Sequence, residues 1–353
     1  MLKTFDEVFD DYTKYGTKIK TEQYHTVGTN IIIDQGQADI AGYTDQIDGL
    51  FKDVPVIVFG DHTRIIKYIN RPFFLGADGT KILKSKIPDA NYKYLYYALK
   101  NAKIPNTGYN RHFKWLKQIS ISYPEHQKQS MIVEILDKLE DSIDNYNIIL
   151  GLLDKLVKAR FIEMFGDGNL PIKTVKELCS CVVDCPHTTP KYEGNLKNPA
   201  IRTSEIKKGF LVWDTMRYVS DKEYVERTTR AIPKAGDIVY GREGTFGNAA
   251  ILPDGYKFCL GQRVMLLRPD YSKCTSEYLL HSVISDEVYR QAIEKNNAST
   301  VAHVNVKDVK QFKVPLPSLD KQNEFANFVK QVDKSRFDIK KSIIELEREV
   351  VYD

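Results

Sequence analysis

The amino-acid sequence contains the same pattern twice. Leu2–Val8 (LKTFDEV) returns as Ile172–Leu178 (IKTVKEL), and near the end of each copy Lys128-Gln129 returns as Lys321-Gln322. The separation between matching positions changes in steps along the chain, so the copies agree in framework and differ in loop length. We therefore predict two copies of one scaffold, each with its own loops.

The composition fits a globular protein with more than one domain. A length of 353 residues predicts two or three domains, and a hydrophobic fraction of 42% is enough to build their cores. There is no apolar run long enough to span a membrane and no secretory signal at the N-terminus, so we predict a cytoplasmic protein. The net charge of +4 permits binding to nucleic acid without requiring it.

Five cysteines, an odd number, fit a reducing compartment. Cys179, Cys181, Cys185 and His187 lie close together, but their spacing is not that of a usual zinc site. In the repeat Cys179 aligns with Phe9, which indicates a buried apolar role. We expect no metal site.

Short elements are predicted in the same order in both copies. In the first copy we expect an amphipathic helix over residues 2–12, strands at 31–33 and 54–59, a helix at 92–100 and a strand at 119–123. In the second copy Asp237–Gly241 matches Val56–Gly60. The predicted fold class is α+β, with two duplicated α/β domains.

A long helix with a heptad pattern closes each copy. Apolar residues recur in alternating steps of four and three, and Arg336 is the polar exception in the second helix. The predicted seam consists of Ile132, Leu136, Leu139, Ile143, Leu150 and Leu153 in the first helix, and Phe325, Val329, Val332, Ile339, Ile343 and Leu346 in the second. This period favours an antiparallel coiled coil between the two helices, with pseudo-two-fold symmetry. The alternative is that each helix packs on its own domain.

These patterns divide the chain into four segments. The first domain is predicted at 1–124, the central helix at 125–165, the second domain at 166–317 and the distal helix at 318–353. Gly166 is the expected end of the central helix, with Pro171 shortly after it.

The sequence contains no convincing catalytic pattern. A phosphate-binding loop, a nucleophile elbow and a zinc-protease motif are all absent from it. Asp184 followed by Glu205 and Lys207 loosely fits a metal-dependent nuclease, but the first copy has no counterpart. We expect no catalytic residues, with the nuclease as the least favoured alternative.

The divergent loops instead carry residues suited to reading DNA. Arginine can bind guanine through two hydrogen bonds, glutamine suits adenine, and lysine contacts phosphates. The candidate DNA-binding residues are Gln35, Gln37, His62, Arg64, Arg111, His112 and Lys114 in the first copy, and Arg202, Arg242, Arg263, His303 and Lys307 in the second.

Several stretches resemble one known family. They are Ile33–Gln37 with Gly42–Asp45, Phe59–Arg64 with Phe73–Thr80, Tyr123–Gln129, Phe161–Asp167, and Pro315–Gln322. These stretches are similar to recurring segments of the specificity (S) subunit of type I restriction-modification systems. The resemblance covers essentially the whole chain, including the order domain, helix, domain, helix.

The resemblance implies a subunit without catalysis. Two target recognition domains, inverted about the helix pair, would each read one half of a bipartite site in double-stranded DNA. The helices would set the spacer and dock two methyltransferase (modification) subunits, which use S-adenosylmethionine. Restriction subunits, which use ATP and Mg, would join the assembly, and this chain itself would need no cofactor. The main alternative is a stand-alone duplicated DNA-binding regulatory protein without methyltransferase partners.

Overall fold

The chain forms two compact units in a computed structural model. The first unit comprises residues 1–146 and 342–353, and the second comprises residues 147–341. The structure describes all residues except 77, 167, 194–196, 245–246, 296–302 and 352–353, so Ala77 and Asp167 of the family-like stretches lie outside the described residues. Among the described residues, no helix has the length and apolar character needed to cross a membrane.

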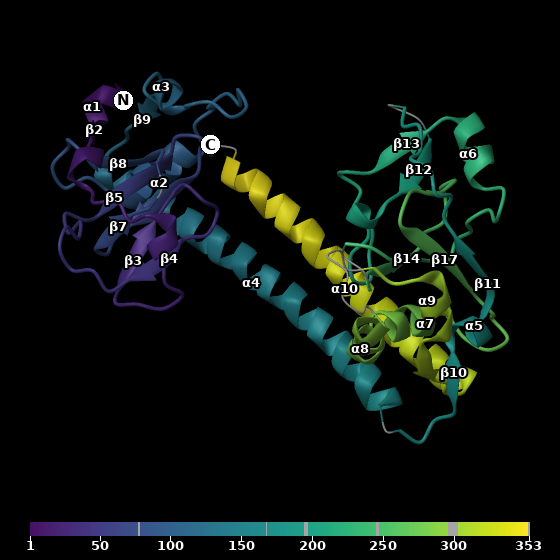
Figure 1. Cartoon of the computed structure of the whole chain (residues 1–353). Coiled ribbons are helices and arrows are strands. Elements are labelled where there is room, and N and C mark those ends of the chain that lie inside the picture. Colours follow the sequence, from purple (N-terminus) through teal and green to yellow (C-terminus); the bar gives the residue numbers. More distant parts are fainter. Residues whose placement is uncertain (77, 167, 194–196, 245–246, 296–302, 352–353) are drawn as a thin grey trace. The chain divides into compact units, whose positions relative to one another are not determined.

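The first domain contains short strands and few helices (Figure 1). Its elements are β1 (Leu2–Thr4), α1 (Phe5–Val8), β2 (Phe9–Asp11), β3 (Asn30–Ile33), β4 (Gly42–Thr44), β5 (Val56–Gly60), β6 (Ile66–Ile69), β7 (Phe73–Leu75), β8 (Thr80–Ser85), α2 (Tyr92–Lys100), α3 (Phe113–Leu116) and β9 (Ser120–Ser122).

The second domain repeats this order with additional helices. Its elements are β10 (Ile172–Thr174), α5 (Val175–Leu178), β11 (Cys179–Asp184), β12 (Asn198–Ile201), β13 (Arg217–Val219), α6 (Asp221–Arg227), β14 (Ile238–Gly241), β15 (Ala249–Ile251), β16 (Cys259–Leu260), β17 (Val264–Pro269), α7 (Ser276–Val283), α8 (Asp286–Lys295), α9 (Val306–Gln311) and β18 (Lys313–Pro315). Long helices follow each domain: α4 (His126–Phe165) and α10 (Leu319–Val351).

The sheets of the two domains correspond strand by strand. The first domain has sheets in the order β1-β9, β2-β8-β5-β6 and β4-β3-β7, and the second has β10-β18, β11-β17-β14-β15 and β13-β12-β16. The parallel pair is at the same place in both, β3 with β7 and β12 with β16. The predicted α+β duplication is therefore confirmed at the level of sheet topology.

The four-stranded sheet lies between two apolar layers in each domain. Along β5 the side chains alternate: Val56 and Val58 pack with the three-stranded sheet, whereas Ile57 and Phe59 pack with helix α2. All five residues of β5 are buried, as expected for a strand covered on both faces. Burial of each such apolar side chain contributes about 1.5–3 kcal/mol.

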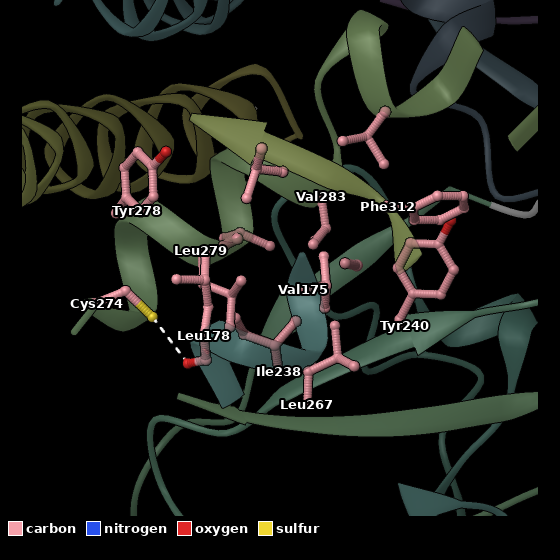
Figure 2. Close-up of a cluster of buried hydrophobic side chains, with 14 of the residues drawn as sticks. Val175, Leu178, Ile238, Tyr240, Leu267, Cys274, Tyr278, Leu279, Val283 and Phe312 are labelled. Atoms are coloured by element: carbon pink, nitrogen blue, oxygen red, sulfur yellow. Dashed lines mark hydrogen bonds between the residues drawn. The ribbon is translucent and has the colours of Figure 1, made fainter. Parts of the chain in front are cut away.

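The same alternation builds the core of the second domain. Ile238 and Tyr240 of β14 face the cluster around α7, and Val239 faces the three-stranded sheet. Figure 2 shows this cluster, in which the Cys274 thiol donates a hydrogen bond to the Leu178 carbonyl oxygen at 3.2 Å. Burial raises the pKa of the Cys274 thiol to about 12, so this cysteine is a structural residue.

The prediction of one helix over residues 2–12 was wrong. A capping box ends the preceding strand at Thr4: the Thr4 amide donates to the Glu7 carboxylate at 2.6 Å, and the helical turn begins at Phe5. Leu2–Thr4 pairs with β9, and Phe9–Asp11 pairs with β8. Pairing with distant strands therefore replaces the helix on both sides of the turn.

The two long helices pack against each other within the second unit. Arg160 of α4 pairs with Glu324 of α10 at 2.7 Å, and Asp154 pairs with Arg336 at 2.6 Å. The later residue of α4 meets the earlier residue of α10, so this stretch is antiparallel. Arg336, the polar exception in the heptad pattern, is held here by an ion pair.

The predicted seam residues are partly or fully buried. In the second unit Leu153, Phe325, Val329 and Val332 belong to one apolar cluster together with Val157. In the first unit Ile132 packs against the core of the first domain. The remaining members are partly buried: Leu136, Leu139, Ile143, Leu150, Ile339, Ile343 and Leu346. A coiled coil along the whole length of both helices stays a prediction.

Candidate nucleic-acid interface

In the first domain, three loops meet beyond the end of β5, and we call this place site 1. The amide of Asp61 donates to the carbonyl oxygen of Gly79 at 2.6 Å, and the amide of His112 donates to the carbonyl oxygen of Asp61 at 2.7 Å. The loop after β5, the β7–β8 turn and the loop before α3 are thus joined through the backbone. The left-handed φ of +64° at Arg64 closes the turn after β5.

Side chains also hold these three loops together. The Gln35 side chain accepts from the amide of His62 at 3.1 Å and donates to the carbonyl oxygen of Asp78 at 2.8 Å. His112 is fully buried, and one of its ring nitrogens lies 3.0 Å from the carbonyl oxygen of Asp61. Gln35 and His112 therefore hold the loops in place.

The structure brings five of the seven candidates of the first copy to this site. Arg64 donates to the Ile104 carbonyl oxygen at 3.3 Å, which ties it to the loop that carries Arg111. Arg111 itself is exposed. Gln37 and Lys114 are also exposed, on the loop after β3 and on α3. DNA contact stays a prediction for all seven.

Tyr109 is a residue of site 1 that the sequence did not single out. Its ring stacks on His62 with centroids 4.8 Å apart and planes 11° apart, although Tyr109 is 89% exposed. An exposed aromatic ring beside Arg111 is suited to contact with bases. The signal in the sequence is a tyrosine between Gly108 and Arg111 in a polar loop.

The second domain repeats these backbone hydrogen bonds beyond the end of β14, and we call this place site 2. The amide of Arg242 donates to the carbonyl oxygen of Arg263 at 2.9 Å, and the amide of Val304 donates to the carbonyl oxygen of Arg242 at 2.9 Å. Arg242 thus takes the place of Asp61, and Arg263 takes the place of Gly79. His303 stands where the first domain has Arg111.

Short contacts between polar and charged groups connect the side chains of site 2. Glu243 binds Arg263 at 2.9 Å and His303 at 3.2 Å, and Arg242 binds Asp184 at 2.9 Å. A hollow of about 620 Å³ lies here, lined by residues that include Asp184, Arg242, His303 and Lys307. The structure therefore brings four of the five candidates of the second copy together.

Arg242 differs from the other candidates because it is buried. Arg242 is 5% exposed, and its guanidinium contacts Asp184 and the carbonyl oxygen of Val304. This burial favours a role in fixing the loop that carries Glu243, and direct contact of Arg242 with DNA stays a prediction.

Arg202, the fifth candidate, belongs to a separate group beyond β12. Its guanidinium binds the buried carboxylate of Glu205 and lies 5.8 Å from the ring centre of Tyr192, and Arg217 lies 5.0 Å from the same ring. Burial opposes ionisation of Glu205, but the hydrogen bonds from Arg202 and Ser204 outweigh it and lower the pKa of Glu205. Tyr192 was missed because its arginine partners are distant in sequence.

The nuclease alternative is not supported by this geometry. Asp184 pairs with Arg242, and Glu205 is buried beneath Arg202 and Thr215. Within the described part of the chain, no three histidine, cysteine, aspartate or glutamate side chains converge to hold a metal ion.

Two segments of the chain, residues 2–152 and 172–348, match the sequence profile of the type I restriction modification DNA specificity domain. The chain belongs to this family. The two matches coincide with the two copies of the fold, so the chain carries two DNA specificity domains. Recognition of DNA sequence within a restriction-modification complex, without catalysis, is the role of such a specificity subunit.

Individual relatives agree with this assignment. The chain is 23% identical over 347 residues to the type I restriction enzyme EcoR124I/EcoR124II specificity subunit of Escherichia coli, covering 92% of this chain and 84% of that protein. It is 22% identical over 297 residues to the type I restriction enzyme MjaVIII specificity subunit of Methanocaldococcus jannaschii, covering 74% and 69%.

Solved structures share the fold of this specificity subunit. The S subunit of a type I restriction-modification system from M. genitalium has a TM-score of 0.53 at 16% identity, covering 99% of this chain and 93% of that chain. A chain solved in work on complex assembly and conformational transition of the type I R-M system has a TM-score of 0.56 at 12% identity, covering 99% and 95%.

Proposed function

We propose that each specificity domain of this chain reads one half of a bipartite site in double-stranded DNA. The observation that carries the proposal is that sites 1 and 2 share the same backbone hydrogen bonds but present different side chains. Site 1 presents His62, Gly79 and Arg111 where site 2 presents Glu243, Arg263 and His303. Loops with the same backbone hydrogen bonds but different side chains are suited to recognise two different half-site sequences.

Selection of bound duplexes from a randomised DNA library tests this proposal. The chain is used with its methyltransferase partner, and the expected product is a split sequence. Arg111→Ala should then change preference only in one half of that sequence, and His303→Ala only in the other. A uniform loss of affinity for all duplexes would contradict the proposal, because it would assign both residues to phosphate contacts.

We propose methyltransferase subunits as the protein partners, docked on the long helices. In the second unit, α4 exposes a row of large apolar side chains in addition to its buried seam: Ile148, Ile149, Leu152, Leu156 and Ile162. Rows of this size on a soluble helix are expected to be covered by a partner. A chain with this fold was solved in work on complex assembly of the type I R-M system, which is consistent with assembly with other subunits.

The cofactors then belong to the partners. S-adenosylmethionine would bind the methyltransferase subunits, and ATP with Mg would bind restriction subunits, in the cytoplasm. Co-expression with each candidate subunit, followed by size-exclusion chromatography, tests this assignment. A chain that binds its split site fully without any methyltransferase subunit would favour the stand-alone regulatory protein.

We also propose that the helices set the spacer between the half-sites. Inserting one heptad after Leu150 and one after Ile343 keeps the heptad register and adds about 10 Å, or roughly three base pairs of DNA. Selection with the insertion variant should yield the same half-sites with a longer gap. An unchanged gap in a folded variant would contradict this role of the helices.

A further inference from the structure

We propose that the second domain reads a guanine through Arg263, and that Glu243 is the residue that positions Arg263 for this contact. The proposal rests on the DNA-reading function proposed above. It adds the class of base and the pair of residues that select it.

The ion pair with Glu243 uses Nε of Arg263 and not its terminal nitrogens. Glu243 Oε2 binds Arg263 at Nε, 2.9 Å away. Among the residues that the structure describes, the terminal nitrogens Nη1 and Nη2 of Arg263 have no acceptor, and the Arg263 side chain is 60% exposed. Two parallel donors are what guanine O6 and N7 accept in the major groove. The guanidinium is therefore bound by Glu243 at Nε, and no other described residue accepts from the two terminal nitrogens that would contact guanine.

The backbone beneath Arg263 is fixed. Arg263 has a left-handed φ of +66°, which is uncommon for a residue other than glycine. Its carbonyl oxygen accepts from the amide of the buried Arg242. Unfavourable backbone angles persist where the surroundings enforce them, and they concentrate at functional sites. The position of the Arg263 Cα is thus set by the domain core.

Glu243 is itself held from two sides. Its second carboxylate oxygen lies 3.2 Å from Nδ1 of His303, and its side chain is mostly buried. The carboxylate offsets the charge of Arg263, which weakens attraction to phosphates in general. Interactions of this kind favour discrimination between bases over affinity for any DNA.

The first domain has no arginine at the position that corresponds to Arg263. Gly79 stands at the position of Arg263, and His62 stands at the position of Glu243. We therefore expect this particular contact in the second half-site, and no contact from the matching position of the first domain.

The test uses the complex of the chain with methyltransferase subunits and the split DNA site selected for it. Each guanine of the second half-site is replaced in turn by 7-deazaguanine, which lacks the N7 acceptor. The wild-type complex should lose roughly tenfold in affinity at one of these guanines, as expected for part of a two-pronged contact. Arg263→Ala removes both donors, so this variant should bind both duplexes equally well.

Glu243→Gln tests the positioning role. It should reduce the discrimination at the same guanine and raise affinity for unrelated duplexes. The matched control is Glu287→Gln, which breaks the exposed pair with Arg290 on α8 of the same domain and should leave discrimination unchanged. Melting temperatures establish that each variant is folded.

The outcomes separate this inference from the proposed function. A wild-type complex that selects no split site would overturn the proposed function and the inference with it. A selected site whose guanines all tolerate 7-deazaguanine, or a discrimination that survives in Arg263→Ala, would overturn the guanine contact alone. Full discrimination in Glu243→Gln would overturn the positioning role.

Discussion

Arg263 occupies in the second domain the backbone position that Gly79 occupies in the first. The φ angles are +66° and +87°, and each carbonyl oxygen accepts a hydrogen bond from the first residue after the central strand. A Cβ atom at Gly79 would lie 2.7 Å from Cδ2 of His62 and 2.9 Å from Nε2 of Gln35. The first domain therefore excludes a side chain where the second presents an arginine.

Gly79→Ala should destabilise the chain, whereas Arg263→Gly should not. We expect Gly79→Ala to lower the free energy of unfolding by about 1–3 kcal/mol, because of the left-handed φ and the clash with His62. Arg263→Gly should leave stability unchanged or raise it by up to about 1 kcal/mol, since glycine tolerates this φ. Urea denaturation measures both, and equal stability of wild type and Gly79→Ala would contradict the predicted clash.

The repeated residues in the sequence mark hydrogen bonds that both domains need. Thr174 and Glu177 form the same capping box as Thr4 and Glu7. Gln129 and Gln322 are buried, and their side chains donate to the carbonyl oxygens of Pro124 and Pro317 at 2.8 and 3.0 Å. The duplicated architecture was therefore predictable, because these contacts are local and recur at matching positions.

The composition of the sites was only partly predictable. Side chains such as Arg263 and His303 could be proposed from their place beside framework residues. Their common partner Glu243 could not, because β14, β17 and the loop before α9 must first fold together to bring the three side chains into contact. The prediction of a helix over residues 2–12 failed for a similar reason. The apolar residues have helical spacing, but the segment pairs with the distant strands β8 and β9 instead.

Phe325 is expected to be essential for the packing of α10 in the second unit. It is 0% exposed, and its ring contacts those of Phe161, Phe165 and His281. Phe325→Ala should lower the free energy of unfolding by about 3–5 kcal/mol. Phe337, on the same helix, is 69% exposed, so Phe337→Ala should cost less than about 1 kcal/mol. Chemical denaturation of the two variants should separate them clearly, and equal losses would contradict this packing.

His281 should make the stability of the second unit sensitive to acid. Burial, and then the charge of Arg336, lower the pKa of His281 from 6.5 to about 4. The unfolded chain therefore takes up a proton near pH 6.5 that the folded chain excludes until about pH 4, so stability is lost as the pH falls through this window. Between pH 7 and pH 5 we expect roughly 2 kcal/mol of loss attributable to His281. His281→Phe should flatten the dependence of unfolding free energy on pH between 7 and 5, and an unchanged slope would show that His281 is not its source.

The exposed apolar row of α4 should act in binding and contribute little to folding. Leu152 and Leu156 are 53% and 47% exposed, in contrast to the neighbouring seam residue Leu153. Replacing both by glutamine should change the free energy of unfolding by less than about 1 kcal/mol. Capture of the methyltransferase subunit should fall at least about tenfold, because the apolar area that the partner covers is lost. Val225→Gln with Ile232→Gln, which changes exposed apolar residues elsewhere in the same unit, is the matched control. Isothermal titration calorimetry measures the affinity, and wild-type affinity in the Leu152/Leu156 variant would place the partner on another face of the chain.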